Sequence, residues 1–166
     1  MLAFFLLIFG VGMRLVVHPA NFTPVLALVL FGSVYLDKKY ALLLPLFLMM
    51  ASDAVLGVHD MVLFTWGSLF LAALIGFWLR RHQSVRNIFL TSTASAVLFY
   101  LVTNFGVWLV GYYPMTLSGL VDCYVLAIPF FRTMLLGTLL YAFVFFGLYE
   151  FIASRVKKTR FAEVAL

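Results

Sequence analysis

The side chains that could bind or coordinate a ligand are few in this sequence, and most fall in three short stretches between apolar runs. Histidine, cysteine, carboxylate and amide groups supply hydrogen bonds or metal ligands, and aromatic rings can line a pocket for a flat ligand. For His59 and Asp60 a plain interfacial turn is an equally good explanation, and the tryptophans and tyrosines are also placed as membrane-interface anchors would be. The candidate ligand-binding residues are His18, Asn21, Asp53, His59, Asp60, Trp66, Asn104, Trp108, Tyr113, Asp122, Cys123 and Tyr124.

Motifs that would mark an enzyme are missing. The sequence contains no paired-histidine zinc motif, no glycine-rich phosphate loop and no serine nucleophile elbow. With a single cysteine it can form no intrachain disulfide. We therefore expect no catalytic residues and no catalytic cofactor, and we expect the polar side chains to serve binding.

The composition indicates a membrane protein. Of the 166 residues, 66% are hydrophobic and 10% are charged, whereas soluble domains are roughly half apolar and about a quarter charged. A chain of this length cannot bury so much apolar surface in its own core, so lipid must be the solvent for much of it. The net charge of +5 does not indicate nucleic acid, because the basic residues lie in short clusters between apolar runs. We expect the lipid bilayer as a partner and no nucleic acid.

Six apolar runs approach the length of about 20 residues that a helix needs to cross the hydrocarbon core. The second run is short, so a full crossing would need a thin region or help from its flanks. The prediction is an all-α bundle of about six transmembrane helices, forming one domain over residues 1–160 with a short cytoplasmic tail at 161–166. The six runs are Leu2–Val17, Thr23–Leu36, Tyr40–Gly57, Met61–Leu79, Ile88–Gly111 and roughly Phe130–Ser154.

The basic residues predict the orientation of the bundle. Basic residues favour the cytoplasmic side of a membrane. With six crossings and a cytoplasmic N-terminus, nine of the 11 lysines and arginines fall on that side, and the three opposite connections contain none. We therefore predict a multi-pass protein with both termini in the cytoplasm and its candidate binding residues at the outer face. The nine residues are Lys38, Lys39, Arg80, Arg81, Arg86, Arg155, Lys157, Lys158 and Arg160.

The third outer connection, residues 111–129, is predicted to be irregular. It is interrupted by Gly119 and two prolines, yet it is too apolar for a freely solvated loop. Irregular backbone at membrane depth persists only where protein buries it or where it lines a water-filled cavity. We therefore predict a partly re-entrant lid over the outer mouth of the bundle. An amphipathic segment lying on the bilayer surface is the alternative.

Two arginines lie apart from the basic clusters, Arg14 near the outer end of the first run and Arg132 at the start of the last. A charge within the membrane costs about 2.5 kcal/mol or more unless it is paired or reaches the interface. Asp53 and Asp122 are the available carboxylates. We predict an Arg14–Asp53 pair that joins the first helix to the third, and an Arg132–Asp122 pair that joins the lid to the last helix.

Several pieces of the sequence carry a resemblance that covers nearly the whole chain. They are the run Arg14-Leu-Val-Val-His-Pro-Ala-Asn-Phe-Thr-Pro24, the run Leu30-Phe31-Gly32, the pair Ser52-Asp53 followed by Gly57, the stretch Tyr113–Arg132, and the pair Leu140-Tyr141 followed by Phe146-Gly147. On these pieces the chain resembles a family of small bacterial membrane proteins. That family is in turn similar to the substrate-binding S-components of energy-coupling-factor (ECF) vitamin transporters.

The resemblance implies both a function and a compartment. S-components are six-helix proteins of the bacterial inner (cytoplasmic) membrane with both ends inside, and they bind a micronutrient beneath their outer loops. By this resemblance the chain is a substrate-binding component for uptake of a vitamin or related micronutrient, with cobalamin as the leading ligand. Cys123, His59 or His18 would then be the candidate cobalt ligands, since thiolate and imidazole are soft or borderline donors.

The resemblance leaves the partner open. Most S-components dock on a shared ECF ATPase module through an alanine-rich stripe of small residues on the first helix. Here that helix offers only Ala3, Gly10 and Gly12, so a solitary mode stands beside docking on the module. A function of another class is the alternative, namely a membrane scaffold or subunit that binds a protein partner through its outer face.

Overall fold

The computed structural model describes residues 2–16, 21–57 and 60–156, and these residues form six α-helices and no strand. Each of the first five helices begins and ends within three residues of a predicted apolar run. The runs are bounded by proline or glycine, which end helices, or by charged residues, which favour the aqueous side of the membrane. The helices are α1 (Leu2–Leu15), α2 (Val25–Tyr35), α3 (Lys38–Leu56), α4 (Val62–Arg81), α5 (Val85–Leu109) and α6 (Leu117–Val156).

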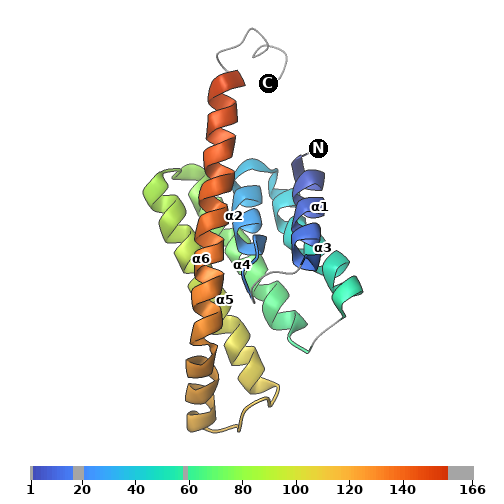
Figure 1. Cartoon of the computed structure of the whole chain (residues 1–166), viewed down its shortest axis with the longest axis vertical. Coiled ribbons are helices and arrows are strands. Elements are labelled where there is room, and N and C mark those ends of the chain that lie inside the picture. Colours follow the sequence, from blue (N-terminus) through green and yellow to red (C-terminus); the bar gives the residue numbers. More distant parts are fainter. Residues whose placement is uncertain (1, 17–20, 58–59, 157–166) are drawn as a thin grey trace.

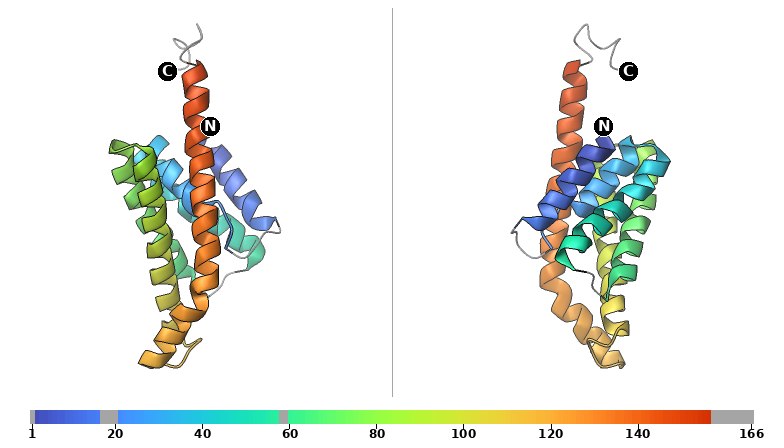
Figure 2. Two further views of the ribbon diagram at one scale, coloured as in Figure 1. Left: turned by 60° about the vertical axis from the view of Figure 1, so that its left-hand side comes forward. Right: turned by 90° about the vertical axis from the view of Figure 1, so that its right-hand side faces the viewer.

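Helix α2 occupies the centre of the bundle. It contacts all five other helices, which follow one another around it in the order α1, α3, α4, α5 and α6 (Figure 2). The ring closes where Phe9 of α1 meets Phe145 of α6, with ring centroids 5.8 Å apart. Every residue of α2 from Val25 to Val34 is buried. The helix is apolar on all sides because it has no face toward lipid or water.

Four helices, α3 to α6, are long and apolar enough to cross a membrane. Many of the large apolar side chains are exposed, among them Phe5, Leu63 and Leu136, as expected of a surface that lipid solvates. The chain is therefore a membrane-spanning helical protein. At 1.5 Å per residue, α2 with its 11 residues is only about 16 Å long, roughly half the thickness of the hydrocarbon core.

The basic turns lie at one end of the bundle. The turn between α2 and α3, the turn between α4 and α5, the start of α1 and the end of α6 all lie toward the same end (Figure 1). These segments carry Lys38, Lys39, Arg80, Arg81 and Arg86, with Arg155 in the last turn of α6. The other end holds the tip of the hairpin formed by α5 and α6, which extends beyond the other helices. We refer to these as the basic end and the hairpin end.

The prediction of irregular backbone through residues 111–129 is wrong from Leu117 onward. Helix α6 runs without interruption from Leu117 to Val156 and contains Pro129. A proline inside a helix removes one hydrogen bond and bends the axis, and the first part of α6 indeed lies at an angle to the rest (Figure 2). This part of α6 forms a hairpin with α5. Its polar side can therefore face α5 and not lipid, which is why a segment of this polarity is helical here.

Candidate functional site

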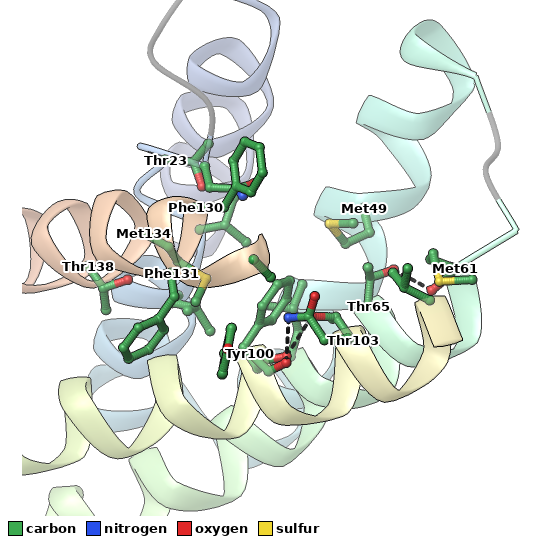
Figure 3. Close-up of a pocket in the computed structure, with 18 of the residues that line it drawn as sticks. Thr23, Met49, Met61, Thr65, Tyr100, Thr103, Phe130, Phe131, Met134 and Thr138 are labelled. Atoms are coloured by element: carbon green, nitrogen blue, oxygen red, sulfur yellow. Dashed lines mark hydrogen bonds between the residues drawn. The ribbon is translucent and has the colours of Figure 1, made fainter. Parts of the chain in front are cut away.

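A cavity of about 400 Å³ lies at the N-terminal end of α2 (Figure 3). Helices α4, α5 and α6 continue toward the hairpin end beyond the point where α2 begins, so the short central helix leaves space there. Asn21, Thr23, Val25 and Leu26 form the part of the wall that belongs to α2 and the segment before it. The volume falls at the lower end of the range of about 300–1,000 Å³ in which small organic ligands bind.

Helix α5 supplies one wall of the cavity. Phe99, Thr103 and Val107 lie four residues apart on one helix face, with Tyr100 and Asn104 beside them. The Thr103 hydroxyl donates to the Phe99 carbonyl over 2.7 Å, and the Asn104 Nδ2 donates to the Tyr100 carbonyl over 2.8 Å. These bonds hold the two polar side chains close to their own helix, so their remaining acceptor capacity is available to a ligand.

Helix α6 supplies a second, adjoining wall. Ala127, Phe131, Met134 and Thr138 follow the helical repeat along one face, and Phe130 lies next to them. Tyr100 and Phe131 bring the two walls together, with ring centroids 4.8 Å apart. Aromatic and methionine side chains dominate this wall, and such side chains pack well against a flat apolar group.

A buried ion pair borders the cavity between α1 and α3. The Arg14 Nη2 lies 3.0 Å from Asp53 Oδ1, and the Trp66 Nε1 of α4 donates to Asp53 Oδ2 over 3.0 Å. The Arg14 guanidinium also contacts the sulfur of Met49. Arg14 lines the cavity, whereas Asp53, whose side chain is 2% exposed, lies behind it. The pair that we predicted between Arg14 and Asp53 is present, and its charges largely cancel.

The predicted binding residues that the structure describes divide into two groups, the first of which lies at or next to the cavity. Asn21 and Asn104 line it. Asn21 has a left-handed backbone conformation with φ of 62°, which asparagine tolerates better than most residues. Asp53 and Trp66 do not line the cavity but hold Arg14 in its wall. All four come from different parts of the sequence, and only the packing of the helices brings them together.

The second group lies in the α5–α6 hairpin and in the turn before α4, away from the cavity. Trp108 donates from Nε1 to the Pro114 carbonyl over 3.0 Å, and the Tyr124 hydroxyl donates to the Leu101 carbonyl over 2.7 Å. Asp60 accepts a hydrogen bond of 3.3 Å from the Tyr112 hydroxyl. Of the remaining three members, Tyr113 is half-buried, Asp122 is exposed and Cys123 is buried. Several of these residues therefore stabilise the hairpin.

No metal site is found in the part of the chain that the structure describes, where no three histidine, cysteine or acidic side chains converge. Cys123 is buried and donates from its sulfur to the Asn104 carbonyl over 3.3 Å, and it does not line the cavity. His18 and His59, the other candidate cobalt ligands, lie outside the described residues. Cys123, the one candidate cobalt ligand among the described residues, is thus not part of the cavity wall.

The predicted pair between Arg132 and Asp122 is wrong. Both residues are exposed, lie on α6 and form no ion pair with each other. Ten residues of helix separate them by about 15 Å along the axis. The prediction assumed that Asp122 belonged to a lid that could fold back onto the last helix, and the continuity of α6 removes that freedom.

Sequence reasoning missed most of the cavity wall. Its hydroxyl groups are isolated threonines within apolar helices, and a single threonine there is as often bonded to its own backbone as to a ligand. A usable signal was the spacing of Ala127, Phe131, Met134 and Thr138, which places a hydroxyl on an otherwise apolar helix face. The missed lining residues that bear hydroxyl, aromatic or thioether groups are Thr23, Met49, Met61, Thr65, Phe99, Tyr100, Thr103, Phe130, Phe131, Met134 and Thr138.

The chain matches a known family over almost its whole length. No curated protein and no solved structure matches it. Residues 1–160, which include all six helices and the complete cavity wall, match a family of unknown function, DUF6580. The chain belongs to this family.

Proposed function

We propose that this protein is a membrane-embedded binding component for the uptake of a vitamin-sized micronutrient. The observation that carries the proposal is the cavity of about 400 Å³ at the start of α2, whose wall combines hydroxyl and amide groups with aromatic rings. A largely apolar pocket with a few convergent polar groups is typical of a site for a small organic molecule. The resemblance to S-components of vitamin transporters favours the same function.

The proposal includes an orientation. Basic loops favour the cytoplasm, and the basic turns gather at one end of the bundle. We therefore propose six crossings of the bacterial inner membrane, with the basic end and both termini in the cytoplasm. The cavity, which lies toward the hairpin end, then faces the outside. Helix α2 covers only part of the bilayer thickness, and this is tolerated because the surrounding helices, and not lipid, lie around it.

The packing around α2 favours capture over free conduction. A second cavity of about 420 Å³ lies beside Tyr35, at the other end of α2. Between the two cavities, Leu28, Val29 and Leu30 are completely buried and apolar. A conducting path needs polar or hydrated lining along its length, whereas here a packed apolar helix separates the two sides. Transfer of a solute would require the helices to move.

The cavity favours a ligand smaller than cobalamin. Its volume suits a single drug-sized molecule, and a corrin ring with its attached nucleotide is several times larger. Cys123 and its hydrogen bond lie in the α5–α6 hairpin and not in the cavity wall. We therefore propose one of the smaller water-soluble vitamins or a compound of that size.

The first helix favours a solitary mode over docking on an ATPase module. Of its small residues, Gly10 faces the interior, where an added Cβ would lie 2.3 Å from Leu48 and 2.9 Å from Leu28. It is therefore not part of an outward-facing surface. Gly12 has open space around it, and one small residue does not make the broad flat stripe that close helix docking uses.

The test is ligand-dependent stabilisation of the detergent-purified protein. Thermal unfolding is followed with thiamine, riboflavin, biotin, nicotinate, pantothenate and cobalamin added separately. A ligand at 100 times its Kd stabilises the native state by about 2.7 kcal/mol, which raises Tm by several degrees. Ala127→Leu, which fills part of the cavity, should abolish the rise. Ala94→Leu, on an exposed part of α5 outside the cavity, should keep it.

Two results would count against the proposal. If no compound raises Tm, the protein is not a binding component for this class of solute, and a protein that co-purifies through the hairpin end would favour the scaffold alternative. If Ala127→Leu and Ala94→Leu respond equally to a stabilising compound, the compound binds elsewhere.

A further inference from the structure

The two ends of α2 differ in the hydrogen-bond partners of their backbone groups. At the C-terminal end of α2, the Arg80 guanidinium donates from Nε to the carbonyls of Ser33 and Val34, both over 3.0 Å, and from Nη2 to Leu36. A cation there satisfies carbonyls that the helix leaves free and complements the negative end of its dipole. The protein thus supplies the partner for this end.

The N-terminal end of α2 has no such partner in the described part of the chain. Its N-cap residue is Pro24, which provides no side-chain hydrogen bond. The first hydrogen bond of the helix comes from the Leu28 N–H to the Pro24 carbonyl. The N–H groups of Val25, Leu26 and Ala27 donate to no acceptor among the described residues.

This uncapped helix end is buried. Val25 is 7% exposed, Leu26 is 4% exposed and Ala27 is fully buried, so bulk water does not solvate their N–H groups. Buried backbone donors in native proteins are nearly always paired. Val25 and Leu26 line the cavity, so a molecule in the cavity is placed to accept from the first turn of α2. The positive end of the helix dipole there favours an anionic acceptor.

A second unpaired donor lies in the same cavity wall. Thr138 of α6 is completely buried, and its hydroxyl has no hydrogen-bond partner in the described part of the chain. It lines the cavity, with its oxygen turned toward Met134 and Phe131 (Figure 3). A threonine in a helix normally donates to its own backbone four residues earlier, as Thr103 and Thr133 do. The free hydroxyl of Thr138 is therefore a ready donor for a ligand.

The charge and shape of the cavity limit the ligand further. The Arg14 charge is matched by Asp53. The positive charge that acts on a ligand is therefore the partial charge of about one half at the N-terminus of α2. That suits one carboxylate better than a phosphate or a dianion. The aromatic rings of Phe99, Phe130 and Phe131 in the wall suit a flat or apolar body attached to the carboxylate.

We propose that the cavity binds a small organic monocarboxylate, with the carboxylate at the N-terminus of α2 and the Thr138 hydroxyl donating to the ligand. This names the ligand class of the site in the proposed function and rests on that function.

The experiment compares acids with their uncharged counterparts. Binding to the purified full-length protein is measured by thermal shift and isothermal titration for three pairs, nicotinate and nicotinamide, biotin and biotinamide, and pantothenate and pantothenol. We expect the acid of at least one pair to bind about 10-fold or more tightly than its partner, because hydrogen bonds to an ionised acceptor are roughly twice as strong as neutral ones.

Two matched variants test the hydroxyl. Thr138→Val should weaken binding of that acid about 10-fold, because one hydrogen bond to the ligand is lost. Thr93→Val removes another hydroxyl that has no partner among the described residues, on α5 and outside the cavity, and should leave binding unchanged.

The outcomes separate the inference from the proposed function. If the neutral members, thiamine or riboflavin bind as tightly as the acids, the carboxylate site is wrong while the uptake component stands. If an acid binds but Thr138→Val retains its affinity, the assigned pose of the ligand is overturned. If no compound in either panel binds, both proposals fall.

Discussion

The Trp66 indole donates its N–H to the Asp53 carboxylate, with 3.0 Å between Nε1 and Oδ2. The other oxygen of the same carboxylate lies 3.0 Å from Arg14. One buried anion thereby links α1, α3 and α4 beside the cavity. One oxygen accepts a hydrogen bond and the other is paired with a cation, and a buried charge is tolerated when it is paired and hydrogen-bonded.

Asp53→Asn should strongly destabilise the protein. The substitution leaves Arg14, which is 17% exposed, without its counterion, and breaking a buried pair in this way typically costs about 3–5 kcal/mol. The measurement is the free energy of unfolding in detergent. Asp122→Asn is the control, since Asp122 is exposed and should change stability by less than about 0.5 kcal/mol. Equal stability of the two variants would show that the pair contributes nothing.

Trp66→Phe should cost more than Trp108→Phe. Both substitutions keep an aromatic ring and remove an N–H that donates over 3.0 Å. Trp66 donates to a buried carboxylate, and a hydrogen bond to a charged group contributes about 1.5–3 kcal/mol to stability. Trp108 donates to a backbone carbonyl, and such a bond contributes about 0.5–1.5 kcal/mol. Unfolding in detergent compares the two directly. The reverse order would contradict the role assigned to Asp53.

Arg80→Lys should destabilise the bundle by about 2 kcal/mol or more, because a lysine cannot donate from a rigid planar fork to the three carbonyls at the end of α2. The adjacent Arg81 is exposed, and Arg81→Lys retains the same charge. It should leave Tm unchanged. If both substitutions are neutral, the guanidinium of Arg80 does not cap the central helix.

Gly119→Ala should disrupt the start of α6, whereas Gly147→Ala on the same helix should not. A Cβ at position 119 would lie 2.1 Å from the Pro114 carbonyl oxygen, and a Cβ at position 147 meets nothing within 4 Å. Alanine also favours a helix over glycine by about 0.5–1 kcal/mol. Gly147→Ala is therefore expected to raise Tm slightly and Gly119→Ala to lower it. A neutral Gly119→Ala would show that the turn after Pro114 can open without cost.

Cysteine labelling in intact cells tests the proposed orientation. Met115→Cys places a thiol at the exposed hairpin end, and His82→Cys places one at the exposed basic end. A membrane-impermeant maleimide should label the first and not the second, and both should react after the membrane is permeabilised. The unmodified chain is the control, since its single cysteine, Cys123, is buried. Labelling of His82→Cys alone would invert the orientation.

Much of the fold was predictable because membrane solvation imposes strong rules on sequence. Apolar runs of spanning length identify helices, and the first five helices match such runs closely. The Arg14–Asp53 pair was predictable as well, because a charge at membrane depth demands a partner and the sequence offers few. The start of α6 was not, because the polarity of residues 117–129 makes sense only when α5 lies against them.

What the sequence by itself determined is therefore the class of the protein, the positions of most helices and the gathering of basic turns at one end. Only the tertiary structure decided that α2 lies at the centre, that Arg80 caps its C-terminal end, and that a cavity opens at its start. The same packing leaves the Thr138 hydroxyl in the cavity wall without a partner among the described residues. The physical reason is that hydropathy reports how a segment is solvated, whereas a cavity depends on where helices of unequal length end relative to one another. That relation is set by packing between residues far apart in the chain.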